Sequence, residues 1–228
     1  MQLYTIIFVV LYLIVLVSYF FSETSGNFKR RAINKILMAA MFMGYAIFEM
    51  FNHSLWGDPL NIRFIIGLFF AFVGDVLLLW SFSKGGISFG ISNVILFIAQ
   101  LKFMSAQGIG FGKYWWFLLI YAALVGTFCI LWFKGWYIWK EKKPEMKFMF
   151  PPYIGTVSLH GTLSIAVLAL APFSVKTVLF CSGLILYMIS DYFISLHKFK
   201  FTESKLVLRL NSGTYFLGLM LAAISFAF

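Results

Sequence analysis

The chain has 228 residues, of which 62% are hydrophobic and only 11% are charged, and it carries a formal net charge of +10. A soluble domain contains about 45–50% apolar and about 25% charged residues, so this composition excludes a soluble globular fold. The charges lie in short segments between apolar runs of about 20 residues, the length of helix that crosses a bilayer.

Eight apolar runs predict an all-α fold, a polytopic membrane helix bundle of about eight transmembrane helices in one domain over 1–228. The first run lacks a preceding basic segment and a small-residue cleavage site, so we expect a retained span. Short loops make neighbouring helices antiparallel, with a break expected at Lys84-Gly85-Gly86. Strands are not expected, because membrane strands alternate polar and apolar residues. The expected spans are 2–21, 32–51, 60–82, 87–107, 114–134, 151–171, 176–196 and 206–228.

Basic residues indicate the orientation, because cytoplasmic loops retain Lys and Arg. Of the 18 basic residues, 14 fall in the odd-numbered loops. We therefore expect the odd-numbered loops in the cytoplasm and both termini outside. The positive charge would then face the anionic leaflet of the lipid bilayer, and no nucleic-acid partner is expected. The 14 residues are Lys29, Arg30, Arg31, Lys35, Lys84, Lys134, Lys140, Lys142, Lys143, Lys147, Lys198, Lys200, Lys205 and Arg209.

Two aspartates, Asp75 and Asp191, lie inside the third and seventh runs, where an ionisable group is costly and indicates a functional site. These two spans run the same way, so at ~1.5 Å per residue the carboxylates would lie ~10 Å and ~8 Å from the cytoplasmic helix ends. The sequence therefore predicts a shared polar cleft, although a single asparagine in a span is also typical of an interhelical hydrogen bond. Other polar residues expected in the same layer are Asn34, Lys35, Asn93, Asn211 and Tyr215, with Gln100 near the midplane.

A possible metal-binding pair, Glu49 and His53, shares one face of the second helix. The other histidines, His160 and His197, fall on different spans without a second ligand at helical spacing. We therefore predict no metal site and no cofactor. A zinc-dependent lipid amidase would need such a site. A serine hydrolase would need a nucleophile elbow, a serine on a turn from strand to helix, and a chain of apolar helices without strands does not support one.

Several short motifs resemble those of the YhhN-like lysoplasmalogenase family. They are Gly74-Asp75-Val76-Leu77-Leu78 in the third span, Ser190-Asp191 in the seventh, Lys35 opening the second and Tyr215-Phe216 in the eighth. Their order covers nearly the whole chain. The resemblance implies an eight-helix membrane hydrolase whose substrate is a lysophospholipid with a vinyl-ether bond, split into an aldehyde and a glycerophospholipid. The chain departs from the family pattern at Ile36, Gln100, Phe103 and Leu219.

Vinyl-ether hydrolysis needs one acid and one base, roles that the resemblance gives to Asp75 and Asp191. The more apolar surroundings of Asp75 favour it as the acid, and Asp191 beside Ser190 would then activate water. Lys35 or Arg209 would meet the lipid phosphate. A membrane transporter or a non-catalytic lipid-binding protein of the same fold is the alternative, because paired carboxylates also relay protons. The predicted substrate-binding residues are Lys35, Asn93, Gln100, Ser190, Asn211 and Tyr215.

Overall fold

The computed structural model describes residues 2–135 and 144–228, and gives side chains for 2–135 and 150–228. Throughout these residues the regular structure is helical, with eight α-helices and three short 3₁₀ helices and no strand. The predicted all-α bundle is confirmed. The α-helices are α1 (Leu3–Glu23), α2 (Phe28–Asn52), α3 (Pro59–Leu78), α4 (Phe82–Ala106), α5 (Phe117–Phe133), α6 (Pro144–Leu170), α7 (Val175–Phe199) and α8 (Lys205–Ile224).

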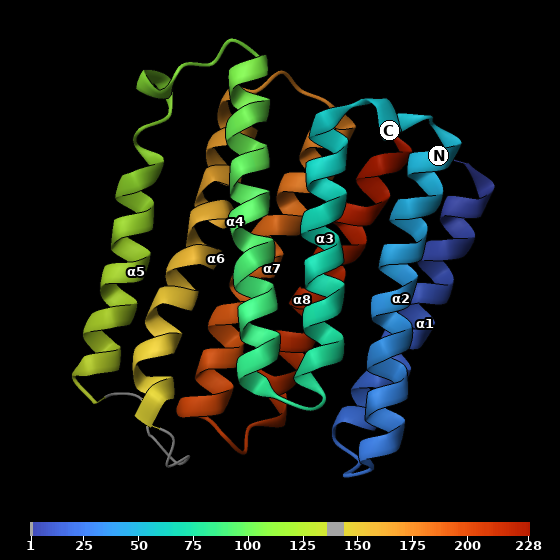
Figure 1. Ribbon diagram of the computed structural model, residues 1–228. Coiled ribbons are helices and arrows are strands. Elements are labelled where there is room, and N and C mark those ends of the chain that lie inside the picture. The colour runs from blue at the N-terminus through green and yellow to red at the C-terminus, as the bar shows by residue number, and fades with distance from the viewer. Residues whose placement is uncertain (1, 136–143) are drawn as a thin grey trace.

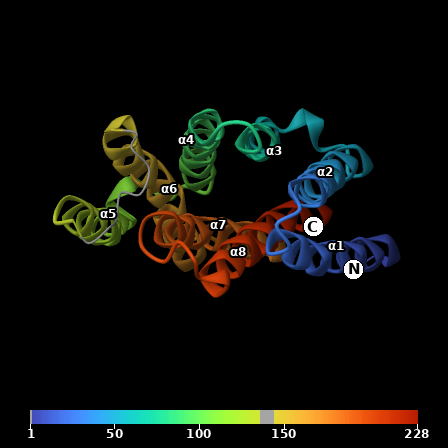
Figure 2. The same ribbon diagram turned by 90° about the horizontal axis from the view of Figure 1, so that it is seen from below.

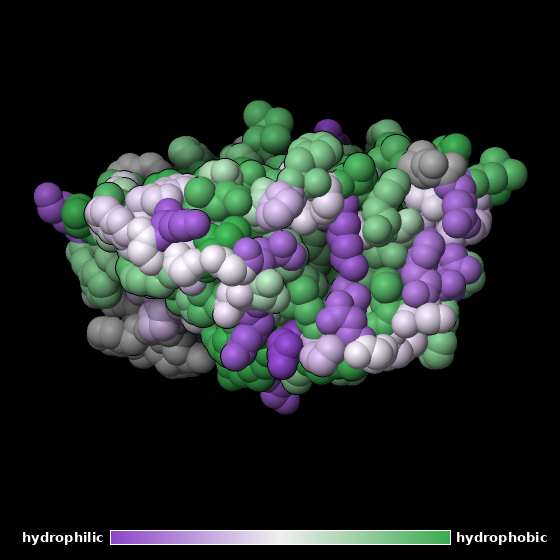
Figure 3. All heavy atoms as spheres, turned by 90° about the horizontal axis from the view of Figure 1, so that it is seen from above, coloured by the Kyte–Doolittle hydropathy of each residue, from purple (hydrophilic) through white to green (hydrophobic). Residues whose placement is uncertain are grey.

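Seven of these helices are long and apolar enough to cross a membrane, and α5 is a shorter apolar helix of 17 residues. Their outward faces carry large apolar side chains, such as Leu3 at 73% and Phe21 at 64% exposed on α1. An apolar surface of this extent fits lipid and not water. Figure 3 shows hydrophilic side chains in patches across an end face of the bundle, with hydrophobic ones between and around them. The chain is a multi-pass membrane protein.

The helices run alternately up and down the bundle, and both termini lie at one end (Figure 1). We call this the terminus end, and the opposite end, which carries the turns 24–27, 79–81 and 200–204, the odd-loop end. Viewed along the bundle, α1 and α5 occupy opposite edges, and α7 and α8 lie between them (Figure 2). Of the basic residues used to predict orientation, Lys140, Lys142, Lys143 and the side chain of Lys147 lie outside the described part. Which end faces the cytoplasm stays a prediction.

Polar caps set several helix starts. Asp58 accepts a hydrogen bond from the Leu60 amide at 2.8 Å at the start of α3, where Pro59 occupies the first turn, as proline prefers. The turn between α3 and α4 is not at Lys84-Gly85-Gly86, as the sequence suggested. It lies at 79–81, because the Ser81 hydroxyl caps the Lys84 amide and the glycines continue the helix.

Close backbone contact joins α7 to α8. A Cβ atom added to Gly183 would lie 2.5 Å from the carbonyl oxygen of Gly218, and one added to Gly218 would lie 2.6 Å from the carbonyl oxygen of Gly183. Only a residue without a side chain permits this approach, which is common between membrane helices. Hydroxyl groups join α3 to α4, since Ser88 and Ser92 each donate to a carbonyl oxygen of α3 at 2.7 Å. These contacts fix the helices that carry the site.

Candidate active site

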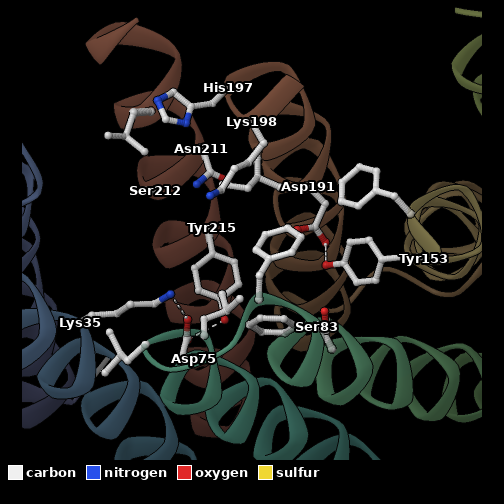
Figure 4. A pocket seen from close by; sticks show the side chains of 18 of the residues that line it. Lys35, Asp75, Ser83, Tyr153, Asp191, His197, Lys198, Asn211, Ser212 and Tyr215 are labelled. Carbon is white, nitrogen blue, oxygen red and sulfur yellow. Dashed lines mark hydrogen bonds and ion pairs between the residues drawn. The ribbon is translucent and has the colours of Figure 1, made fainter. Parts of the chain in front are cut away.

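A cavity of about 510 Å³ is lined by residues of α2, α3, α4, α6, α7 and α8 and by the last turn of α1. Its volume lies within the range of small-molecule binding sites. Asp75 from α3 and Asp191 from α7 both line it, and Figure 4 shows them on different walls of the same space. The structure thus brings together the two carboxylates that the sequence singled out. We call this space the main cavity.

Asp75 has two partners from two other helices. Its Oδ1 atom lies 3.2 Å from Nζ of Lys35 on α2, and its Oδ2 atom accepts a hydrogen bond from the Tyr215 hydroxyl on α8 at 2.6 Å (Figure 4). The Asp75 side chain is only 1% exposed. The buried carboxylate is therefore paired with both a cation and a hydroxyl donor, as a buried charge requires.

Asp191 has different surroundings. Its Oδ2 atom accepts a hydrogen bond from the Tyr153 hydroxyl on α6 at 2.8 Å (Figure 4). Among the residues that the structure describes, no basic side chain lies within 4.0 Å of its carboxylate. Tyr153 follows Pro151 and Pro152, which lie inside the helix.

The two carboxyl groups therefore differ in charge stabilisation. An adjacent ammonium stabilises an ionised carboxylate, whereas a buried carboxyl group without a cation is more stable when it keeps its proton. Asp75 has the ammonium of Lys35, and Asp191 has only the hydroxyl of Tyr153. The main cavity can thus hold one ionised and one protonated carboxyl group, the arrangement that acid–base catalysis uses.

The mouth of the main cavity, at the odd-loop end, carries charged residues. Arg31 and Lys198 line it, and among the described residues no carboxylate lies within 4.0 Å of either. Glu23 of α1 accepts hydrogen bonds from the Tyr19 hydroxyl at 3.1 Å and from the Ser212 hydroxyl at 2.5 Å. Two cations at the entrance of an apolar-walled cavity suit an anionic head group.

Some of the predicted site residues lie elsewhere. Lys35, Asn211 and Tyr215 line the main cavity together with the two aspartates, whereas Asn93, Gln100 and Ser190 do not. Ser190 is buried and donates to the carbonyl oxygen of Tyr187 on its own helix at 2.7 Å. Gln100 donates to the Ser164 hydroxyl on α6 at 2.5 Å, and Asn93 is fully buried.

Sequence reasoning missed several lining residues, above all Tyr153. A tyrosine within an apolar run carries no charge that marks it, and nothing in the local sequence links it to Asp191. The signal available was its position just after two prolines in the span. Glu23, Arg31, Lys198 and Ser212 were also missed as cavity residues, because they lie at helix ends that meet only in the folded bundle.

The Glu49 and His53 pair lies at the other end of α2, away from the main cavity. The His53 Nε2 atom is 3.3 Å from the Glu49 Oε2 atom, which also accepts from the Tyr4 hydroxyl at 3.3 Å. The shared helix face predicted from their spacing is therefore present. In residues 2–135 and 150–228 no group of three or more His, Cys, Asp and Glu side chains is placed to hold a metal ion.

The four departures from the family pattern lie outside the main cavity. Gln100 and Phe103 line a second cavity of about 340 Å³, formed near the terminus end by α3, α4, α6 and α7. Ile36 is 38% exposed on the outside of the bundle, and Leu219 is fully buried in the hydrophobic core. None of the four altered positions is therefore among the residues that line the main cavity with Asp75 and Asp191.

In a comparison with protein families, the model of the YhhN family matches residues 30–226. This range includes α3 to α8 and nearly all of α2, and hence both aspartates with Lys35, Tyr153 and Tyr215. No match was found among curated proteins or among solved structures.

Proposed function

This chain belongs to the YhhN family, and we propose that it is a membrane hydrolase that cleaves the vinyl-ether bond of lysoplasmalogens. The observation that carries the proposal is the pair of buried carboxyl groups, Asp75 and Asp191, which face one cavity with different partners. Such a pair supplies one acid and one base without a further group.

The partners favour Asp191 as the acid and Asp75 as the base, the reverse of the sequence-based expectation. The ammonium of Lys35 stabilises an ionised Asp75, which can accept a proton from water.

In the first step Asp191 donates its proton to the vinyl carbon remote from the ether oxygen. The π electrons form the new C–H bond, and the positive charge is shared between the other vinyl carbon and the oxygen. Asp75 then removes a proton from a water molecule as the water oxygen bonds to that carbon, which gives a hemiacetal. Asp75 is now protonated and Asp191 ionised.

The two aspartates exchange roles when the hemiacetal breaks down, so that Asp75 is the acid and Asp191 is the base. Asp75 returns its proton to the ether oxygen as the C–O bond breaks, and Asp191 removes the proton of the hemiacetal hydroxyl. The products are a fatty aldehyde and a glycerophospholipid, and both carboxyl groups are back in their starting states. One water molecule is consumed and no other reactant is needed.

The cavity also suits the substrate. Its walls include the apolar side chains of Leu78, Ile87 and Ile194, which can contact an alkenyl chain. Lys35 is engaged by Asp75 and Arg209 does not line the cavity, so Arg31 and Lys198 at the mouth are the cations available to a lipid phosphate. Phosphate binding at the mouth would place the vinyl ether deeper, between the carboxyl groups.

The test is product analysis by mass spectrometry after the detergent-purified protein is incubated with vinyl-ether, alkyl-ether and acyl lysolipids. We expect aldehyde release from the vinyl-ether lipid alone. Asp75→Asn and Asp191→Asn should each abolish it, whereas Glu49→Gln, a matched change of a buried carboxylate outside the cavity, should not. Full activity of either aspartate variant, or intact recovery of every lipid, would reject the proposal and favour a lipid-binding protein or a transporter.

Deuterium incorporation into the substrate shows which aspartate is the acid and which is the base. In D₂O the Asp75→Asn variant should still protonate the vinyl carbon and lose the proton again, so unreacted substrate gains deuterium at that carbon. Asp191→Asn should leave the substrate without deuterium. The opposite pattern would return the acid role to Asp75.

A further inference from the structure

Three polar side chains lie unpaired in the core of the bundle, between the main cavity and the second cavity. Asn93 of α4, His160 of α6 and Tyr187 of α7 are each fully buried. Within the described part of the chain, the amide nitrogen and oxygen of Asn93 and both ring nitrogens of His160 have no hydrogen-bond partner. The Tyr187 hydroxyl lies near the Ser92 side chain but also has no partner at hydrogen-bonding geometry.

Helix geometry places these groups in a row. Asn93 and Gln100 are two turns apart on one face of α4, and His160 and Ser164 are one turn apart on one face of α6. The two faces meet where Gln100 donates to Ser164. Because α4 and α6 both run toward the terminus end (Figure 1), Asn93 and His160 lie at adjoining levels on the odd-loop side of that contact.

The row reaches the wall of the main cavity at one end. The His160 ring centroid is 5.3 Å from that of Tyr187, and the Tyr187 ring centroid is 5.5 Å from that of Tyr215 and 6.3 Å from that of Phe89. Tyr215 and Phe89 both line the main cavity. One ring layer thus separates the row from the carboxylate of Asp75.

At its other end the row reaches the second cavity, which Gln100 lines. The Ser164 hydroxyl donates its proton to the carbonyl oxygen of His160 at 2.8 Å, so Gln100 must present its amide nitrogen to Ser164. This leaves the buried Gln100 Oε1 atom without a partner in the described residues. Unpaired polar atoms therefore continue from one cavity to the other.

We propose that this polar row, formed by Asn93, Gln100, His160 and Tyr187, binds a chain of water molecules that connects the second cavity to the main cavity. A buried polar atom without a partner costs about 1–3 kcal/mol, and buried water is the usual partner where protein groups are lacking. The row supplies donors and acceptors on three helices, as a bound water needs.

The role of this water rests on the proposed hydrolase function. Each turnover consumes one water molecule, while a lipid bound in the main cavity closes the mouth with its head group and covers the apolar walls. Water held in the polar row reaches the carboxylate of Asp75 from the side that the lipid does not occupy. The rings of Tyr215 and Phe89 lie between this water and the main cavity, so the water would pass between the two rings.

Water binding can be tested by a measurement that does not depend on activity. X-ray radiolytic labelling of the purified protein in H₂¹⁸O modifies side chains that lie next to bound water. Tyr12 is the matched control, since it is also fully buried but its hydroxyl donates to the carbonyl oxygen of Phe216 at 2.9 Å. We expect Tyr187 to be labelled about tenfold faster than Tyr12, because only Tyr187 adjoins unpaired polar groups. Equal rates would overturn the proposal.

Variants test the row itself. Asn93→Leu with His160→Phe replaces the unpaired groups by apolar ones of similar size, and Gln100→Leu is a milder change if the double variant does not fold. We expect Tyr187 labelling to fall to the rate of Tyr12 and kcat to fall about tenfold with KM unchanged, since water supply and not lipid binding is affected. Thr162→Val is the control, because the Thr162 hydroxyl is also buried but donates to the carbonyl oxygen of Ser158 on the same helix at 2.6 Å.

The outcomes separate this proposal from the proposed function. Aldehyde release by a protein whose Tyr187 is not labelled would overturn the water chain and leave the hydrolase standing. Rapid labelling of Tyr187 in a protein that cleaves no lipid would support water binding and overturn its role in hydrolysis. A normal kcat in the Asn93→Leu, His160→Phe variant, when its Tyr187 is no longer labelled, would also overturn that role.

Discussion

Lys35 and Asp75 form an ion pair with 3.2 Å between Nζ and Oδ1, and their side chains are only 15% and 1% exposed. The pair joins α2 to α3, and the Tyr215 hydroxyl adds α8 to the same carboxylate. A single carboxylate therefore both connects three helices and, in the proposed reaction, accepts the proton of water. Its structural and chemical roles can be separated by substitution.

Lys35→Met should destabilise the protein by about 3 kcal/mol, because it leaves the buried Asp75 carboxylate without its cation. Activity should fall strongly, since Asp75 would then favour the protonated form and cannot act as a base. The measurements are the thermal unfolding midpoint in detergent and the rate of aldehyde release.

The double variant Lys35→Met with Asp75→Asn should regain most of the lost stability but none of the activity, because no unpaired charge remains and the base is still absent. A double variant as unstable as Lys35→Met would show that the lysine stabilises the bundle by packing and not through the ion pair.

The two tyrosines should differ in what their removal costs. Tyr215→Phe removes a hydrogen bond to the ionised Asp75 and should cost about 2 kcal/mol, whereas Tyr153→Phe removes a bond to the neutral Asp191 and should cost about 1 kcal/mol. Thermal unfolding of both purified variants measures the difference. The reverse order would contradict the assignment of the charge to Asp75.

The contact between α7 and α8 should not tolerate a side chain. Gly183→Ala puts a methyl group 2.5 Å from a backbone oxygen, so the helices must separate, and we expect a loss of about 2 kcal/mol. Gly44→Ala is the matched control, since nothing lies within 4 Å of the added atom, and it should be neutral or stabilise α2 by about 0.5–1 kcal/mol. Equal unfolding midpoints for the two variants would contradict the close helix contact.

Cysteine labelling in whole cells tests the orientation. In a background with Cys129 and Cys181 replaced by alanine, Ser25→Cys reports on the odd-loop end and Gly110→Cys on the terminus end. If the basic end faces the cytoplasm as predicted, a membrane-impermeant maleimide should label Gly110→Cys in intact cells and Ser25→Cys only after permeabilisation. Labelling in the opposite order would invert the orientation.

The helices could be predicted because each is a continuous apolar run, but some of their ends could not. The sequence placed the start of the sixth span at 151, yet α6 begins at Pro144 and carries Pro151 and Pro152 inside it. Hydropathy detects where a helix becomes apolar, not where its hydrogen bonds begin. The α3–α4 turn shifted for a similar reason, since the Ser81 cap outweighs the glycines after it.

The aspartate pair could be predicted because a carboxylate within an apolar run has no local explanation. Their charge states could not, because the deciding partners, Lys35 and Tyr153, lie on other helices. The local sequence around Asp75 is the more apolar, which favoured a protonated carboxyl group. The fold favours the ionised form instead, because it brings Lys35 next to Asp75. Gln100, expected near the midplane, was predicted to bind substrate, whereas the face of α4 on which it lies turns it toward α6.

The first helix has a particular place in this architecture. The range matched to the family begins at residue 30, after α1 ends at Glu23, yet Tyr19 and Glu23 line the mouth of the main cavity. In the proposed hydrolase, two residues outside the matched range would therefore contact the polar part of the lipid. Exchanging the first helix would then change which head groups enter the cavity without altering Asp75 or Asp191.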